Sequence, residues 1–367
     1  MHRWLSSVVV TAFAAVAISS ALLIAQTPTA TGAKPAAGAK PQATPAKTAA
    51  PAKPAAKAWS APKTPWGDPD LQGVWNDATS TPLQRPNGKG ETVGEGDASQ
   101  FEEQLASDLN RDRRDGGPEI DVNRAYNEHW MDSRRLKITE DRRTSLIVDP
   151  PDGRLPPQVQ ISPERQKIRA ERQAAANRFN AGMPLVATEL SLPIRCIIRT
   201  DSPPYLPTIY NNDFQIYQSP GYVVIAPEMI HSARMIPLDG RPHLGKNLHQ
   251  WLGDTRGHFE GNTLVIETTN FRTDDGTVYQ GANPATYKIT ERFTRVANDT
   301  VNYEFTINDP MTWSKPWTAV VPWTKIDPKE QMYEYMCHED NFDIVHLLTG
   351  ARNREKNPSL NLQPAKR

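Results

Sequence analysis

Residues 300–309 read TVNYEFTIND, and their side chains alternate in character. Val301, Tyr303, Phe305 and Ile307 are apolar, whereas the residues between them are polar. Successive side chains of a strand point to opposite faces, so this period of two predicts an antiparallel strand that is buried on one face only.

The neighbouring sequence continues the pattern. Further strands are predicted within YVVIAPEMIHSARMIPLDGR (222–241), TLVIETT (263–269), TYKITERFTRV (286–296), PWTAVVPWTKID (316–327) and EQMYEYMCHE (330–339). At least seven sequential strands must hide their edges, which predicts a mainly β fold: an antiparallel up-and-down barrel or strongly curled sheet with a few peripheral helices. A β-propeller is the alternative, because PPDGRLP (150–156) is echoed by PLDGRPH (237–243), but two copies do not establish a repeat.

Three helices are expected around this β region. In residues 97–114, apolar side chains recur every four positions, which predicts a helix with a thin apolar stripe. Residues 162–179 form the firmer prediction, because Ser162 is a suitable N-cap and a proline follows it in the first turn. Residues 342–352 are predicted to form a short closing helix.

The N-terminal residues indicate export. MHRW is followed by an uncharged apolar run to residue 25, which predicts a signal peptide over residues 1–25. The run is also long enough to remain as a membrane anchor. Residues 26–63 are rich in Ala, Pro and Lys and contain no acidic residue, so we expect a disordered linker that is able to touch the cell-envelope surface. The predicted location is therefore periplasmic or extracellular.

We expect the remaining chain to consist of two parts. Residues 64–140 are predicted to form an N-terminal segment, a loop and a helix, which pack on a β-rich domain over residues 141–367.

The whole sequence has 42 basic and 42 acidic residues, and seven of the basic ones lie in residues 1–63. Removing those seven leaves 35 basic against 42 acidic residues. This excess of acidic residues argues against a nucleic-acid partner, because phosphate binding needs a basic face.

Cys196 and Cys337 are the two cysteines of the sequence. In an exported protein two such cysteines most often form a disulfide, which would stabilise the fold by about 4–5 kcal/mol through loop-closure entropy. A catalytic thiol is the alternative, and it would need a reducing compartment.

A polar group of residues within WLGDTRGHFEGN (251–262) has two interpretations. In the structural one, Asp254 and Arg256 pair with each other or with backbone amides at a turn, and His258 lies on a hairpin arm. In the functional one, Asp254, Arg256 and His249 line the mouth of the barrel, where strand ends and loops converge on a ligand.

Two more clusters are candidates. Glu228 and His231 have an E-x-x-H spacing, but on strands positions i and i+3 face opposite sides, so we predict no metal site. His338 and Glu339 directly follow Cys337, and capping of the closing helix by Asp340 or Asn341 is the structural alternative.

Six of the eight histidines fall within 116 positions of the β region, next to several carboxylates. A histidine paired with a carboxylate is able to act as a general base near neutral pH. The predicted catalytic residues are His231, His249, Asp254, Arg256, His338 and Glu339. The predicted ligand-binding residues are Asn211, Glu228, Trp251, Trp317 and Tyr333, with core packing as the alternative for the aromatic ones.

Several common enzyme motifs are missing. The sequence has no G-x-S-x-G, H-E-x-x-H, G-x-G-x-x-G, P-loop or C-x-x-C-H motif, which argues against the corresponding hydrolases, zinc peptidases, dinucleotide enzymes, NTPases and c-type cytochromes. No cofactor is predicted.

The stretches WGDPDLQGVW (66–75), QWLGDTRGHFEGNTLVIETTNF (250–271) and YEYMCHEDN (333–341) resemble those of a widespread group of secreted bacterial proteins of uncharacterised function. The resemblance spans roughly residues 64–352 and implies export and a β-rich fold. It implies no catalytic residue. Two functions are therefore predicted: an exported hydrolase or lyase acting on a carbohydrate or related small molecule, or a noncatalytic protein that binds such a ligand.

Overall fold

The computed structural model describes residues 59–109, 132–199, 201–230, 232–272, 278–279 and 281–360. The predicted signal peptide and most of the predicted linker lie outside this part. None of the helices within it is both long enough and apolar enough to cross a membrane. The last linker residues do make contacts: Ala61 is buried, and Lys63 forms a β-bridge with Pro69.

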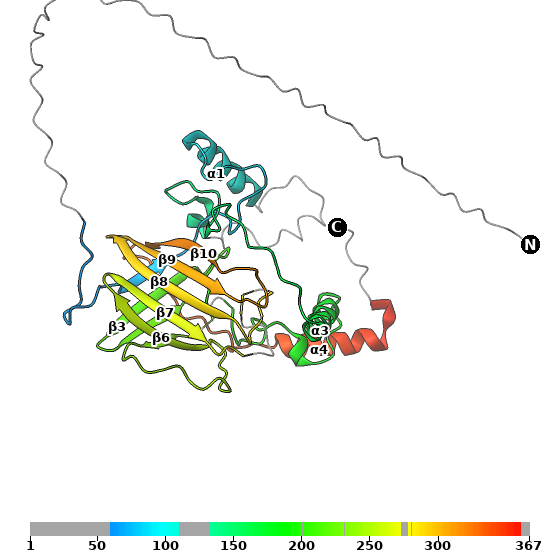
Figure 1. Ribbon diagram of the computed structural model, residues 1–367. Coiled ribbons are helices and arrows are strands. Elements are labelled where there is room, and N and C mark those ends of the chain that lie inside the picture. The colour runs from blue at the N-terminus through cyan, green and yellow to red at the C-terminus, as the bar shows by residue number, and fades with distance from the viewer. Residues whose placement is uncertain are drawn as a thin grey trace, which may run out of the picture. The chain divides into compact units, whose positions relative to one another are not determined.

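The centre of the molecule is an antiparallel, nearly closed barrel (Figure 1). Its strands are β1 (Gly73–Asn76), β3 (Asp213–Ser219), β4 (Tyr222–Pro227), β5 (Arg234–Pro237), β6 (Asp254–Glu260), β7 (Thr263–Thr269), β8 (Lys288–Ala297), β9 (Thr300–Asn308) and β10 (Trp317–Lys325). Their order is β5-β4-β3-β1-β10-β9-β8-β7-β6. The predicted barrel is therefore confirmed, and the propeller alternative is wrong.

Strand β1 lies between the first and last strands of the β3–β10 meander. It pairs with β3 on one side and with the end of β10 on the other. The short strand β2 (Ile147–Asp149) pairs with the start of β10. An up-and-down meander from β3 to β10 thus receives an N-terminal strand between its first and last members.

The barrel interior is filled by alternate side chains, as the sequence period predicts. Val301, Tyr303, Phe305 and Ile307 of β9 are all fully buried. Aromatic rings from neighbouring strands pack on them; for example, Trp323 of β10 lies 5.2 Å from Tyr303 between ring centroids. Since the other face of β9 is only half-buried, the strand has the one-sided burial expected for an antiparallel barrel.

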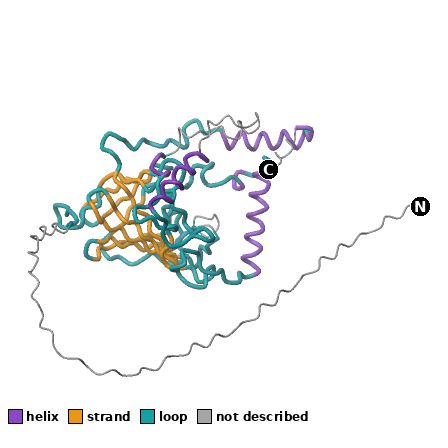
Figure 2. The backbone as a smooth tube through the Cα atoms, turned by 90° about the horizontal axis from the view of Figure 1, so that it is seen from above, coloured by secondary structure: helices purple, strands orange, loops and turns teal. Residues whose placement is uncertain are grey.

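Three α-helices lie outside the barrel wall in the described part: α1 (Glu95–Leu109), α3 (Pro163–Asn180) and α4 (Asp343–Lys356). Figures 1 and 2 show α3 and α4 beside one end of the barrel. The Oγ atom of Ser162 accepts a hydrogen bond from the backbone N–H of Arg165, as predicted for the N-cap. The short 3₁₀ turns are η2 (Ser133–Leu136), η3 (Ala187–Glu189) and η4 (Pro358–Leu360).

The predicted strand over residues 330–339 is wrong, because this segment is irregular and makes no ladder. Tyr333 and Met336 are exposed, so the alternation does not correspond to one buried face. The predicted disulfide that ends the segment is confirmed: Cys196 and Cys337 are joined, with their Cα atoms 5.5 Å apart.

The seam of the barrel lies between β5 and β6, which are adjacent in space but share no ladder. Gly257 of β6 faces this seam. A Cβ atom at Gly257 would lie 2.6 Å from Cγ2 of Ile236 and 3.0 Å from Cδ2 of Leu238. The close approach of the two strands therefore requires a residue without a side chain.

A buried ion pair crosses the interior behind this seam. Arg234 of β5 donates through Nη1 and Nη2 to the two carboxylate oxygens of Glu291 on β8, at 3.0 and 2.6 Å. Tyr205 and Thr268 accept further hydrogen bonds from Arg234, and Tyr303 donates to Glu291. Burial lowers the pKa of Arg234, but the charge of Glu291, the interaction with Tyr205 and the hydrogen bonds to both together raise the pKa above its ordinary value.

We expect Gly257→Ala to lower the free energy of unfolding by about 1–3 kcal/mol, because the added methyl group overpacks the seam. Urea denaturation measures the change. Gly350→Ala in α4 is the control: a Cβ there meets nothing within 4 Å, so this variant should be neutral or stabilised by up to about 1 kcal/mol. Equal stabilities of the two variants would contradict a tightly packed seam.

We expect Arg234→Met to cost about 3–5 kcal/mol, because it leaves the Glu291 carboxylate buried without its partner. The double variant Arg234→Met, Glu291→Leu removes both charges and should regain part of that loss. Denaturant titration of both proteins checks this. A double variant as unstable as Arg234→Met would show that the charge left behind is not the cause.

Candidate functional site

Asp254 and Arg256, at the start of β6, form a compact hydrogen-bonded cluster on the outer face of the barrel, which we call the polar knot. The Asp254 carboxylate is 97% buried and accepts hydrogen bonds on both oxygens. Its Oδ1 atom accepts from Nη1 of Arg256 at 2.7 Å. Its Oδ2 atom binds Nδ1 of His243 and the backbone N–H of Leu244, each at 2.8 Å.

The loop between β5 and β6 is held against the end of β7. Asn270 has a left-handed backbone, with φ of 55°, and its side chain donates to the carbonyl of Leu244 at 3.1 Å. The Asn270 carbonyl accepts from the backbone N–H of Gln250 at 2.9 Å. Asn270 therefore fixes both ends of the 244–250 turn.

Two histidines of this loop are held in the same way. Nδ1 of His249 lies 3.1 Å from the carbonyl oxygen of Phe271, which only accepts hydrogen bonds, so this nitrogen carries the proton. Nδ1 of His243 faces a carboxylate oxygen and is the donor there by the same argument. In a neutral ring, Nε2 is then the basic nitrogen, so both histidines expose the same kind of proton acceptor.

His243 and His249 line one cavity of about 370 Å³, which we call the histidine pocket. Thr269, Asn270 and Thr286 supply polar groups to its wall. The remaining lining residues are Leu244, Lys246, Pro284, Ala285, Tyr287 and Lys288. Within the described part of the chain, no Asp or Glu lines this pocket.

The polar knot therefore has a structural role, and through Asp254 it also holds His243 of the histidine pocket. Arg256 pairs with Asp254, as in the structural interpretation, and its Nε atom donates to the carbonyl of Pro242 at 3.0 Å. It does not line the histidine pocket, and it lies on the outer face of the wall, next to Glu267 of β7. Arg256 is linked through Asp254 to His243. His243 is not one of the predicted catalytic residues.

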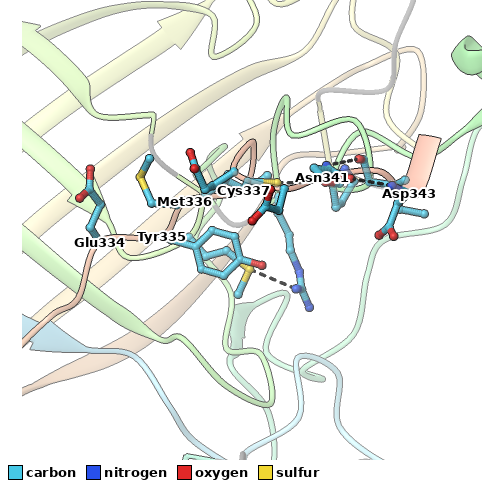
Figure 3. Close-up of a pocket in the computed structure, with 13 residues that line it drawn as sticks. Glu334, Tyr335, Met336, Cys337, Asn341 and Asp343 are labelled. Carbon is cyan, nitrogen blue, oxygen red and sulfur yellow. Dashed lines mark hydrogen bonds between the residues drawn. The ribbon is translucent and has the colours of Figure 1, made fainter. Parts of the chain in front are cut away.

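The other predicted catalytic residues lie elsewhere. A cavity of about 510 Å³ beside the disulfide, the disulfide pocket, is lined by Cys337 and Glu339 (Figure 3). Figure 3 shows Glu334, Tyr335 and Met336 following one another along one side of it. His338 does not line this cavity, and His231 lies outside the described residues. Of the predicted catalytic residues, His249 lines the histidine pocket and Glu339 lines the disulfide pocket, so the structure does not bring the predicted set together.

Two predicted ligand-binding residues meet in a carboxylate cluster at the ends of β1, β3 and β4. Glu228 accepts a hydrogen bond from the side chain of Asn211. Asp213 lies nearby and shares the Asn76 side chain with Asp132, with Nδ2 at 2.7 and 2.6 Å from the two carboxylates. Burial raises the pKa of Glu228, and the negative charge of Asp213 raises it further. Among the described residues, no group of three or more side chains has the geometry of a metal site.

The predicted aromatic contacts have different surroundings. Trp317 is fully buried inside the barrel and packs edge-on against Phe305, which places it in the core rather than at a ligand surface. Trp251 is half-buried beneath the guanidinium group of Arg272, at 4.5 Å from its ring centroid. Tyr333 is exposed.

Sequence reasoning missed His243, Lys246 and Lys288 as members of one pocket. His243 belongs to the PLDGRPH turn, and it meets Asp254, 11 positions further along the chain, only because the segment between them folds back. A histidine at the end of a turn, shortly before a strand that begins with polar residues, is a sequence signal for a functional site. This signal does not identify the residue with which the histidine pairs.

Comparisons with known proteins add little to this geometry. No protein-family model and no curated protein sequence matches the chain. The resemblance to secreted bacterial proteins therefore stays a prediction. Among solved structures, the chain is similar to a "secretary abundant heat soluble (SAHS)" protein from Ramazzottius varieornatus, with 11% identity over 31% of this chain and 70% of that one. The TM-score is 0.20, at which the likeness supports no argument about function.

The raised pKa of Glu228 has a consequence for stability. Its folded-state pKa lies above the unfolded value, so its contribution is fully present below the unfolded pKa and is lost as the pH rises through the folded pKa. At pH 7 we therefore expect Glu228→Gln to be more stable than the native protein, by up to about 1 kcal/mol, because a partly exposed charge is screened by water. The gain should vanish at pH values below the ordinary Glu pKa.

Glu260→Gln is the matched control for this experiment. Hydrogen bonds from His258 and Arg292 lower the pKa of Glu260, so its removal should reduce stability at pH 7 rather than raise it. Denaturant titrations at several pH values measure both. A Glu228→Gln variant that is less stable than the native protein at pH 7 would contradict the assignment.

Proposed function

We propose that the protein is an exported hydrolase or lyase that acts on a carbohydrate or related small molecule in the histidine pocket. The observation that supports this most is the matched arrangement of His243 and His249. Each ring is held at Nδ1 and has Nε2 as its basic nitrogen. Both line one cavity, which supports a mechanism in which one neutral ring takes a proton from the substrate while the other, when protonated, donates one.

Asp254 has a positioning role in this proposal. It fixes the tautomer and orientation of His243, and its 97% burial keeps it from the ligand. Arg256 in turn holds Asp254 and the carbonyl of Pro242, so it acts through the loop rather than on substrate. Catalysis by this pair of histidines is worth about 100- to 10,000-fold in rate, the usual range for general acid–base groups.

A noncatalytic carbohydrate-binding protein is the second candidate. The observation that favours it is that Asp254 already accepts from three donors. A carboxylate that is so fully bonded secures the loop on which His243 and His249 lie, and those side chains then serve equally as hydrogen-bonding groups for a ligand. The two candidates differ only in whether bound sugar is converted.

We expect His243→Gln to reduce turnover by about 100-fold or more while the fold is retained. The assay uses neutral and uronic-acid-containing oligosaccharides, with new reducing ends as the readout for hydrolysis and ultraviolet absorbance of a new C=C bond for elimination. A bell-shaped pH–rate profile that loses one limb in the variant would separate proton transfer from a structural effect.

His258→Gln is the control, because His258 lies on β6 with Asp254 but is exposed and pairs with Glu260 away from the pocket. It should keep full activity. Native protein that binds the oligosaccharides without converting any would reject the enzyme and leave the binding protein.

A further inference from the structure

We propose that the ligand of the histidine pocket is a sugar that carries an anionic group, bound by Lys246 and Lys288. This deepens the proposed function, and it rests on the same pocket being the ligand site. Four of the lining side chains carry a positive charge or gain one on protonation: His243, Lys246, His249 and Lys288. Such a lining stands out in a chain whose residues beyond 63 carry more acidic than basic groups.

Nearby carboxylates of the described part are already bound by other groups. Asp254 is buried behind His243 and is bound by Arg256. Glu267 is on the outer face of β7, outside the pocket lining, and pairs with Lys288, with Oε1 at 2.6 Å from Nζ. Asp254 and Glu267 thus pair with Arg256 and Lys288, and among the described residues Lys246 is the lining lysine whose charge is not offset by an ion pair.

Lys246 is the stronger of the two anion ligands. Among the described residues its ammonium group has no ion-pair partner, whereas Lys288 shares its charge with Glu267. Lys246 also lies on the turn in which the N–H of Leu248 donates to the carbonyl of Gly245. Since Asn270 fixes both ends of this turn, the lysine backbone is held in place before a ligand arrives.

The rest of the lining indicates hydroxyl groups as the other half of the ligand. Thr269, Asn270 and Thr286 offer hydroxyl and amide groups that donate and accept. No exposed aromatic platform lines the pocket in the described residues, because Tyr287 is almost fully buried. Hydroxyl recognition beside ammonium groups fits a uronic acid or a sulfated sugar better than a neutral or apolar ligand.

The test is calorimetric titration of the full chain with three disaccharides that differ in one group: a glucuronic acid disaccharide, its neutral glucose counterpart and a sulfated analogue. We expect the two anionic sugars to bind at least about tenfold more tightly than the neutral one, with affinity falling as salt is added. The stronger binder of the two identifies the anionic group as carboxylate or sulfate. Equal affinity for the neutral sugar would overturn the proposal.

Three variants assign the effect to the pocket. Lys246→Gln should lower the affinity for the anionic sugar by about tenfold and leave the affinity for the neutral sugar unchanged. Glu267→Gln should act in the opposite direction and tighten binding, because it releases Lys288 from its ion pair. Lys315→Gln, an exposed lysine outside the pocket, should change nothing. Unchanged binding in both Lys246→Gln and Glu267→Gln would overturn the proposal.

The outcome is separate from that of the catalytic proposal. Tight, lysine-dependent binding without turnover would support the anionic ligand and reject the enzyme. Turnover of neutral sugars that depends on His243 but not on Lys246 would support the enzyme and overturn the anionic ligand.

Discussion

The fold depends on the ion pair of Arg234 and Glu291 inside the barrel. Two charges withdrawn from water are tolerated only when most of their hydrogen-bonding groups are matched. Here Tyr205, Thr268 and Tyr303 add three hydrogen bonds to the pair, and among the described residues the Nε atom of Arg234 has no partner. The partners come from β5, β7, β8, β9 and the segment before β3, so a slip of one residue in any of these strands would expose a charge to apolar side chains. Replacing such a pair by apolar residues is often neutral or stabilising, so we interpret the pair as selecting one register rather than as a main source of stability.

The seam explains why the candidate site lies where it does. β5 and β6 are joined by no ladder, so the chain between them must fasten that side of the barrel by other bonds. Asp254 and Arg256 do so by binding His243, the N–H of Leu244 and the carbonyl of Pro242. The same bonds orient His243 toward a pocket. The polar knot therefore closes the barrel as the structural interpretation predicts, and through His243 it also holds a side chain of the histidine pocket, although Asp254 and Arg256 do not line that pocket.

Much of the fold follows from local sequence signals. β9 is predicted by strict alternation, and α3 by Ser162, because these features act within a few residues. The failure over residues 330–339 has the opposite cause: the segment has a strand-like composition, but β10, the strand before it in the chain, is already paired with β9 on one side and with β1 and β2 on the other. β1 itself is four residues long, and its place between β3 and β10 depends on contacts more than 130 positions away, which no local period encodes.

The site was harder to predict than the fold, for a related reason. Asp254 and Arg256 are two residues apart on one strand face, so their pairing is readable from the sequence. His243 reaches Asp254 only through a turn whose path is set by Asn270, a residue in a left-handed conformation that the sequence does not mark. That path also decides the chemistry. With both its oxygens occupied, Asp254 serves as a fixed acceptor, and the imidazole rings of His243 and His249 are the titratable groups that the loop presents to the pocket. The loop from 243 to 250 and the barrel wall therefore both shape this pocket: the loop supplies the two histidines and Lys246, and the wall supplies Thr269 and Lys288.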